Sequence, residues 1–238
     1  MTSALSPAVV AATHDLELAA RLVVEGLRAG GHKSPFHGYS AEFQQHRPYR
    51  AGDDLKYLDW KILARTDRLY SKQFRETTSM SVMIVLDTSP SMAFPAEGIS
   101  KFRYASIVAA ALAYLISAQG DAVGLMTMSD NAYVYLAAKG GRPHVRSLIS
   151  RIDRLTPKNA WNAQRVISRS ADLLKRRGVV IVISDFYDDE DVTRRELRRV
   201  AAHGHDVTML QILSPSELDF PYRGDVELED LESGERRL

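Results

Sequence analysis

Two short apolar segments constrain the fold of this chain more than any other feature. The segments SVMIVLD and VVIVISD, at residues 81–87 and 179–185, are almost continuously apolar, rich in β-branched residues, and end in an aspartate. Strands without polar alternation are typical of a parallel sheet that is covered on both faces. We therefore expect these segments to be fully buried strands of an α/β sheet.

Strands and helices are predicted to alternate along the rest of the chain. Apolar spacing predicts helices at residues 13–28, 101–120, 144–155, 162–178 and 192–205, and further strands at 69–77, 121–129, 132–138 and 206–213. Residues 30–67 are rich in Gly, Pro, aromatic and charged residues, which predicts loops and short strands. The predicted fold class is α/β, with three layers in which a mainly parallel, Rossmann-type sheet is flanked by helices.

We expect the chain to have three parts. Residues 1–78 form an N-terminal helix and short-strand extension, residues 79–216 form the sheet domain, and residues 217–238 form an acidic C-terminal tail. A length of 238 residues is sufficient for one domain of ordinary size with a small appendage.

The composition excludes several classes of function. The chain has no cysteine, which rules out disulfides, thiol catalysis and thiolate metal sites. Its formal net charge of +1 gives no general attraction to nucleic acids or membrane surfaces. No apolar run reaches the roughly 20 residues of a membrane-spanning helix, and the first residues do not resemble a signal peptide. We therefore expect a cytoplasmic protein that neither binds nucleic acid nor inserts into a membrane.

An aspartate ends each of the two buried strands. If the strands are neighbours, Asp87 and Asp185 enter one crevice at the carboxyl edge of the sheet, where α/β proteins bind ligands. Ser89 and Ser91 follow the first aspartate in the pattern Asp-x-Ser-x-Ser. Carboxylate and hydroxyl oxygens suit Mg²⁺ or Mn²⁺. The alternative is that each aspartate only caps the turn after its strand.

This pattern resembles the metal-ion-dependent adhesion site of von Willebrand factor A domains. The resemblance implies a divalent ion held by Asp87, Ser89, Ser91 and Asp185. It also implies a vacant position on the ion for an acidic group of a partner. In that family a loop threonine completes the metal shell, but here Trp161 occupies the matching position and cannot ligate. Asn162 beside it offers an amide oxygen, so we expect an incomplete site for Mg²⁺ or Mn²⁺.

A longer motif lies in the N-terminal part of the chain. It consists of Gly52-Asp53-Asp54, Leu58-Asp59-Trp60 and Ala64-Arg65. These segments resemble the signature of the bacterial family called domain of unknown function fifty-eight, in which a von Willebrand A-like domain follows directly. The resemblance implies the same arrangement here, from about Leu16 to Glu235.

Two interpretations of the signature are open. In the first, its charged residues form a polar network and Trp60 is an anchor that docks the extension onto the sheet domain. In the second, Trp60 and Arg65, with Asp53, Asp54 and Asp59, form a partner-binding surface, since Trp and Arg are frequent hot spots of interfaces.

The resemblance also implies a partner. Genes of this family commonly neighbour those of MoxR-type AAA+ ATPases, so the leading hypothesis is a non-enzymatic adaptor with a degenerate metal-ion-dependent adhesion site that acts with such an ATPase in complex assembly or remodelling. The second hypothesis is metal-independent binding through the region of Trp60 and Arg65. The third is a Mg²⁺-dependent phosphohydrolase centred on Asp87, which is less favoured because such enzymes usually carry a second aspartate where this chain has Ser89.

Overall fold

The computed structural model describes most of the chain. The residues described are 13, 15–29, 41–50, 53, 55, 58–76, 80–95, 98–129, 132–158, 161–174, 176–187, 190–224, 227–232 and 234–237. The chain divides into two compact units, one made of residues 34–79 and the other of residues 1–33 together with 80–238. Each unit is described by itself.

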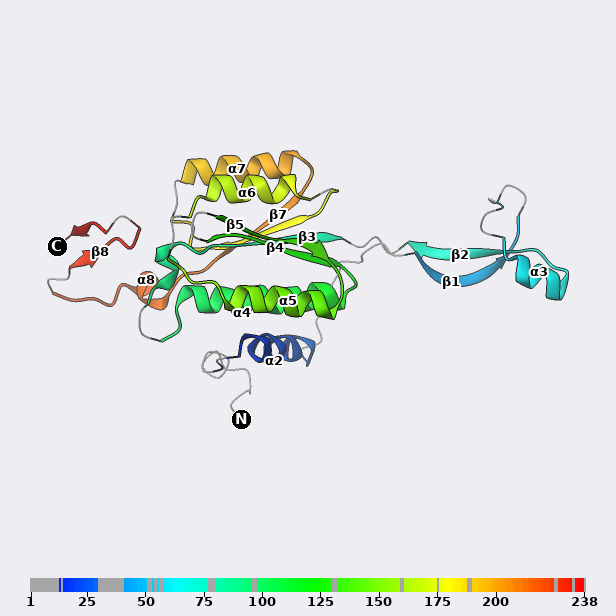
Figure 1. Ribbon diagram of the computed structural model, residues 1–238, viewed down its shortest axis with the longest axis horizontal. Helices are drawn as coiled ribbons and strands as arrows, with labels where there is room; N and C mark the ends of the chain where they lie inside the picture. The colour runs from blue at the N-terminus through cyan, green and yellow to red at the C-terminus, as the bar shows by residue number, and fades with distance from the viewer. Residues whose placement is uncertain are drawn as a thin grey trace. The chain divides into compact units, whose positions relative to one another are not determined.

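The larger unit is built on a five-stranded sheet (Figure 1). Its strands, in spatial order, are β5 (Ala132–Lys139), β4 (Ala122–Ser129), β3 (Ser81–Leu86), β6 (Val179–Ser184) and β7 (Asp206–Gln211). Strands β4, β3, β6 and β7 are parallel, and β5 pairs antiparallel with β4 at one edge. The expected mainly parallel sheet is therefore confirmed.

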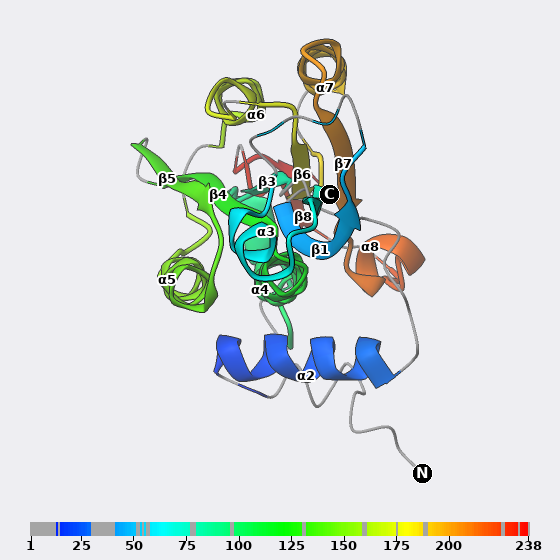
Figure 2. The same ribbon diagram turned by 90° about the vertical axis from the view of Figure 1, so that its right-hand side faces the viewer.

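Helices cover both faces of this sheet (Figure 2). One face carries α6 (Ala163–Asp172) and α7 (Glu190–Ala202), and the other carries α4 (Lys101–Ala118) and α5 (Arg142–Asp153). Each layer buries its own apolar cluster against the sheet. The structure therefore has the three expected layers.

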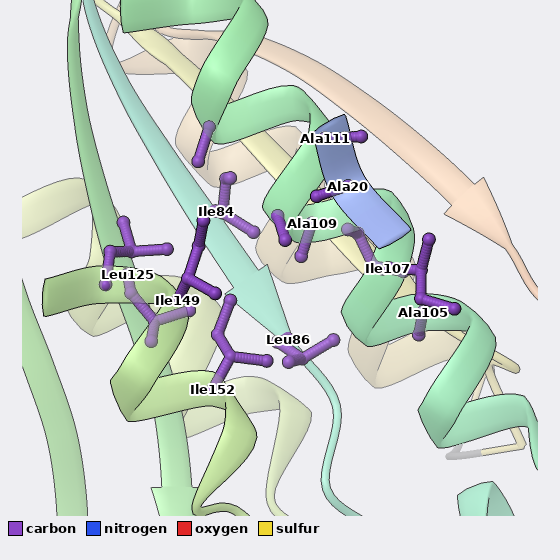
Figure 3. Close-up of a cluster of buried hydrophobic side chains, with 14 of the residues drawn as sticks. Ala20, Ile84, Leu86, Ala105, Ile107, Ala109, Ala111, Leu125, Ile149 and Ile152 are labelled. Carbon is purple, nitrogen blue, oxygen red and sulfur yellow. The ribbon is translucent and has the colours of Figure 1, made fainter. Parts of the chain in front are cut away.

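The first helix, α2 (Leu16–Ala29), packs on the outer side of α4. Figure 3 shows Ala20 of α2 near Ala109 of α4, and both side chains are fully buried. This second covering explains why α4 is apolar on nearly all sides. The expected division at residue 78 was wrong for this helix, which belongs with the sheet because its apolar stripe is buried there.

The length and apolar composition of α4 also match those of a membrane-spanning helix. Among the residues that the structure describes, no other helix is long and apolar enough to cross a membrane. Just over half of α4, 56%, is buried inside the structure, and its buried residues belong to the core cluster beneath the sheet.

The smaller unit contains a helix between two antiparallel strands. Strand β1 (Ala41–Pro48) pairs with β2 (Tyr70–Glu76), and α3 (Trp60–Thr66) lies between them in the sequence. We expected loops and short strands in this region, and the helix was missed. A helix of seven residues is too short to show an apolar period, but Asp59 caps its first turn and Asp67 ends it in a left-handed conformation with φ of 54°.

The acidic tail is partly folded onto the larger unit. It contains the short helix α8 (Pro215–Asp219) and a pair of two-residue strands, β8 (Leu228–Glu229) and β9 (Arg236–Arg237). Ser214 and Glu217 form a capping box at the start of α8. Two glutamates of this tail contact the candidate site.

Candidate functional site

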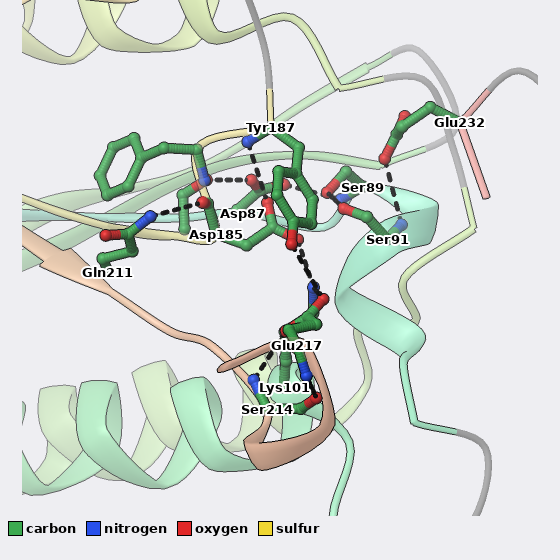
Figure 4. A network of polar contacts seen from close by, with 12 residues as sticks. Asp87, Ser89, Ser91, Lys101, Asp185, Tyr187, Gln211, Ser214, Glu217 and Glu232 are labelled. Carbon is green, nitrogen blue, oxygen red and sulfur yellow. Dashed lines mark hydrogen bonds and ion pairs between the residues drawn. The ribbon is translucent and has the colours of Figure 1, made fainter. Parts of the chain in front are cut away.

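Strands β3 and β6 place two aspartates side by side at the carboxyl edge of the sheet. The strands are paired in register from Val82 with Val179 to Leu86 with Ile183, so β6 ends one residue beyond β3. Asp87 and Asp185 follow directly, and each is 1% exposed. A small crevice of about 20 Å³ lies here, lined by Asp87, Ser89, Ser91, Asp185, Tyr187 and Glu232. The structure thus brings together the four residues that the strand-end pattern singled out (Figure 4).

Hydrogen bonds from its own chain hold the Asp87 carboxylate. Its Oδ1 accepts the backbone N–H of Ser89 at 2.7 Å, and its Oδ2 accepts the hydroxyl of Ser184. Burial raises the pKa of Asp87 to about 7, although these hydrogen bonds oppose the shift; the nearby Asp185 adds to it. Asp87 therefore changes its protonation state near neutral pH.

A lysine supplies the positive charge of the crevice. Lys101 is the first residue of α4, after the N-cap Ser100, and is 2% exposed. Its Nζ lies 2.8 Å from Oδ2 of Asp185 and 2.6 Å from Oε1 of Glu217. Burial alone would lower the pKa of Lys101, but the hydrogen bonds with the two carboxylates outweigh burial and raise it. A charged ammonium group therefore neutralises one of the two strand-end aspartates.

These residues do not fit a divalent metal ion. The Lys101 ammonium already contacts Asp185 and would repel a cation placed between the two aspartates. The hydroxyls of Ser89 and Ser91 lie 3.0 Å apart, a spacing that adjacent ligands of an octahedral ion also have, so the misfit comes from Lys101. The expected set of Mg²⁺ or Mn²⁺ ligands is present in space, but Lys101 neutralises one of its two carboxylates from within the chain.

The loop residues expected beside the metal have other roles. Trp161 is buried in the apolar cluster beneath α6 and α7, 9% exposed. Asn162 is the N-cap of α6, and its Oδ1 accepts the backbone N–H of Arg165 at 2.8 Å. The oxygen of Asn162 thus serves the first turn of this helix, and its role as a metal ligand stays a prediction.

Sequence reasoning missed three members of the site. Lys101 looked like an ordinary helix residue, although its side chain is buried at the start of a largely apolar helix. The pattern Ser-x-x-Glu predicts that Glu217 belongs to a capping box, but nothing in the sequence predicts its ion pair with Lys101. No sequence pattern pointed to Glu232. Its Oε1 accepts the backbone N–H of Ser91 at 3.1 Å, across 141 residues of sequence.

In the smaller unit, two signature aspartates stabilise local structure. Oδ1 of Asp59 accepts the N–H groups of Lys61 and Ile62, and its Oδ2 lies 3.0 Å from Nε2 of His46. Asp53 accepts the N–H of Arg50 at 2.9 Å and pairs with the guanidinium of Arg47 at 2.7 Å.

The pKa of Asp53 is lowered, most strongly by the hydrogen bond from the backbone of Arg50 and next by the hydrogen bond from the side chain of Arg47. Asp53 and Asp59 thus each hold local polar contacts within this unit, and the polar-network interpretation of the signature stays a prediction. Asp54 lies outside the described residues.

The tryptophan of the signature is exposed within its own unit. Trp60 begins α3 and is 64% exposed, and Arg65 in the last turn of the same helix is also exposed. The anchor interpretation concerns the docking of this unit onto the sheet domain, and it stays a prediction. A partner-binding role for Trp60 and Arg65 stays a prediction.

Comparison with known proteins identifies relatives of the chain. A family model described as "Protein of unknown function DUF58" matches residues 45–238. Uncharacterized proteins of Mycobacterium bovis and Mycobacterium tuberculosis are each 30% identical to it over 232 residues, which cover 96% of this chain and 72% of each relative.

Two solved structures are also similar. An aerotolerance-related membrane protein from Bacteroides fragilis has a TM-score of 0.49 at 19% identity, over 58% of this chain and 69% of that chain. The conserved hypothetical protein BatB from Bacteroides thetaiotaomicron has a TM-score of 0.48 at 18% identity, over 67% of this chain and 75% of that chain.

Proposed function

Since the chain belongs to the family of proteins of unknown function DUF58, we propose that it is a non-enzymatic interaction module with a von Willebrand factor A-like sheet domain. Its binding site is the carboxyl edge of the sheet around the crevice, and binding there is independent of a divalent metal. A cytoplasmic location is part of this proposal.

The contact of Lys101 with Asp185 carries the proposal. The adhesion site that the sequence resembles needs a metal ion to join its aspartates to a partner. Here the ammonium of Lys101 lies 2.8 Å from Asp185, so the same aspartate is neutralised without an ion. The position of the crevice at the ends of two adjacent parallel strands is where α/β proteins bind their ligands.

An enzyme centred on Asp87 has less support. A nucleophilic carboxylate must reach the atom that it attacks. Asp87 is 1% exposed, both its oxygens accept hydrogen bonds from the chain, and the crevice beside it measures about 20 Å³. A phosphate ester would have to displace these hydrogen bonds before it could meet the carboxylate.

The proposed partner is a MoxR-type AAA+ ATPase, as the family resemblance implies, with this chain as its adaptor in complex assembly or remodelling. The exposed Trp60 and Arg65 of α3 supply a second contact surface. Exposed tryptophan and arginine side chains bury much area and form directed hydrogen bonds when a partner covers them.

Binding of the ATPase to the immobilised chain tests the proposal. We expect the Kd of the nucleotide-free ATPase from the same organism to be unchanged between excess EDTA and millimolar Mg²⁺. We also expect electron paramagnetic resonance to detect no saturable Mn²⁺ binding to the chain. Loss of capture in EDTA, or saturable Mn²⁺ that disappears in Asp87→Ala, would overturn the metal-independent mechanism. Failure of the ATPase to bind in either buffer would overturn the choice of partner.

A further inference from the structure

A large cavity lies next to the crevice, between the sheet edge and the folded tail. Its volume is about 710 Å³, within the range of typical ligand-binding pockets. It shares Ser91, Tyr187 and Glu232 with the crevice. The tail supplies most of the remaining lining. A group that enters this cavity would therefore lie against the proposed binding site.

The cavity concentrates negative charge. The described residues that line it include five carboxylates, Glu217, Glu227, Glu229, Asp230 and Glu232, and one ammonium, that of Lys101. The chain as a whole has a formal net charge of +1, so this excess is local. A concave surface with one sign of charge attracts ligands of the opposite sign.

Aromatic side chains also line the cavity. Phe220 and Tyr222 pack edge to face with ring centroids 5.3 Å apart, and their side chains are 57% and 42% exposed. Phe94 and Tyr187 add two further rings to the lining. Aromatic faces beside carboxylates favour ammonium and guanidinium groups, because the ring quadrupole attracts a cation.

The chain already binds one of its own cations in this way and pairs a second with carboxylates of the lining. The Nζ of Lys101 lies 4.7 Å from the centroid of the Tyr187 ring and also contacts Glu217. The guanidinium of Arg236 lies 3.1 Å from Glu229 and 3.9 Å from Glu227. The same surface therefore shows contacts of both kinds, with an ammonium and with a guanidinium.

We propose that this cavity binds a lysine or arginine side chain from a basic segment of the partner. The inference rests on the proposed function and names the chemistry that this function recognises. It also reverses the charge of the expected ligand: a metal-containing site would grip an acidic group, whereas the carboxylates of this cavity repel one.

Binding of small labelled peptides to the full chain tests the inference. The probes are a fluorescein-labelled Gly-Arg-Gly-Arg-Gly peptide and two analogues in which citrulline or glutamate replaces arginine. Fluorescence anisotropy should show saturable binding of the arginine peptide that weakens as salt is added. The citrulline peptide, which keeps the shape and loses the charge, should bind about tenfold more weakly or worse.

Two double variants locate the binding. Phe220→Ala with Glu229→Gln should raise the Kd of the arginine peptide by about tenfold. Tyr133→Ala with Glu190→Gln is the matched control, since Tyr133 and Glu190 are an exposed aromatic and an exposed acid outside the cavity, and it should leave the Kd unchanged. No binding of the arginine peptide, equal binding of the citrulline peptide, or equal losses in both variants would overturn the inference.

The outcome is separable from that of the proposed function. If the ATPase is captured and the arginine peptide does not bind, the charge of the recognised group was inferred wrongly and the interaction module stands. If the peptide binds at this cavity and the ATPase does not, the cation site stands and the proposed partner fails.

Discussion

The ammonium of Lys101 lies 2.8 Å from the carboxylate of Asp185, although 84 residues separate them in the sequence. Both side chains are almost fully buried, at 2% and 1% exposure. The pair joins the first turn of α4 to the end of β6, so it connects a covering helix to the sheet edge. Lys101 also places beside Asp185 the positive charge that a metal ion would otherwise supply.

Removal of this lysine should destabilise the fold. Lys101→Met leaves Asp185 and Glu217 without their cation, and breaking a buried ion pair from one side costs about 3–5 kcal/mol. Urea denaturation of the variant and the wild type measures the difference in the free energy of unfolding. The double variant Lys101→Met with Asp185→Asn should recover part of the loss, because the uncompensated charge is then removed. A single variant as stable as the wild type would contradict the role of the pair.

The same position should control metal binding. Lys101→Ala removes the ammonium and leaves Asp87, Asp185 and Glu217 near one another with no cation between them. Carboxylates in such a cluster bind Mn²⁺, so electron paramagnetic resonance should detect saturable Mn²⁺ in this variant and none in the wild type. Adding Asp185→Asn should abolish the new site. Equal Mn²⁺ binding by wild type and Lys101→Ala would show that the lysine does not take the place of the metal.

The pH dependence of stability should report on Asp87. Burial raises its pKa from 3.8 to about 7, so the folded chain holds a proton that the unfolded chain releases. The contribution of this group to stability is therefore complete below pH 3.8 and is lost as pH rises to about 7. A shift of this size corresponds to about 4 kcal/mol.

The variant Asp87→Asn removes this dependence. Its free energy of unfolding, relative to that of the wild type at the same pH, should increase as pH rises toward about 7 and be constant above it. Because groups such as His205 are shared by both proteins, their titration cancels in the comparison. Thermal melts at matched pH values measure the difference, and a flat difference across this range would show that Asp87 is ionised throughout.

Trp60→Ala should weaken partner binding without unfolding the chain. Because Trp60 is 64% exposed, we expect its loss to change the free energy of unfolding by less than about 1 kcal/mol, while a hot-spot tryptophan raises the Kd by about tenfold or more. Asp59→Ala is the control with the opposite profile, since it removes the N-cap of α3 at about 1 kcal/mol. A large loss of stability in Trp60→Ala would instead support the anchor interpretation.

Trp161→Thr should not create a metal site. The substitution places a threonine where the adhesion-site pattern expects one, but Trp161 is part of the apolar cluster beneath α6 and α7. Truncation of a buried tryptophan costs about 3–5 kcal/mol. Mn²⁺ titration should show no gain over the wild type while urea denaturation shows the loss of stability. A gain in Mn²⁺ affinity would mean that this loop does reach the crevice.

The strands and the main helices could be predicted from the sequence. The β-branched runs of β3 and β6 report burial on both faces, and the apolar spacing of α4 and α5 reports helices. The pair Asp87 and Asp185 was visible for the same reason, because each ends a recognisable strand. The helix α3 was missed because seven residues are too few to show a period.

The sequence by itself determined the strands of the sheet and the helices that cover it, and that a crevice with two aspartates follows if β3 and β6 are neighbours. Only the tertiary structure decided that they are neighbours, that α2 covers α4, and that Lys101 and Glu232 enter the site. The physical reason is the range of the interactions. Apolar periodicity is a local signal of burial, whereas an ion pair across 84 residues or a hydrogen bond across 141 exists only after packing has brought the partners together.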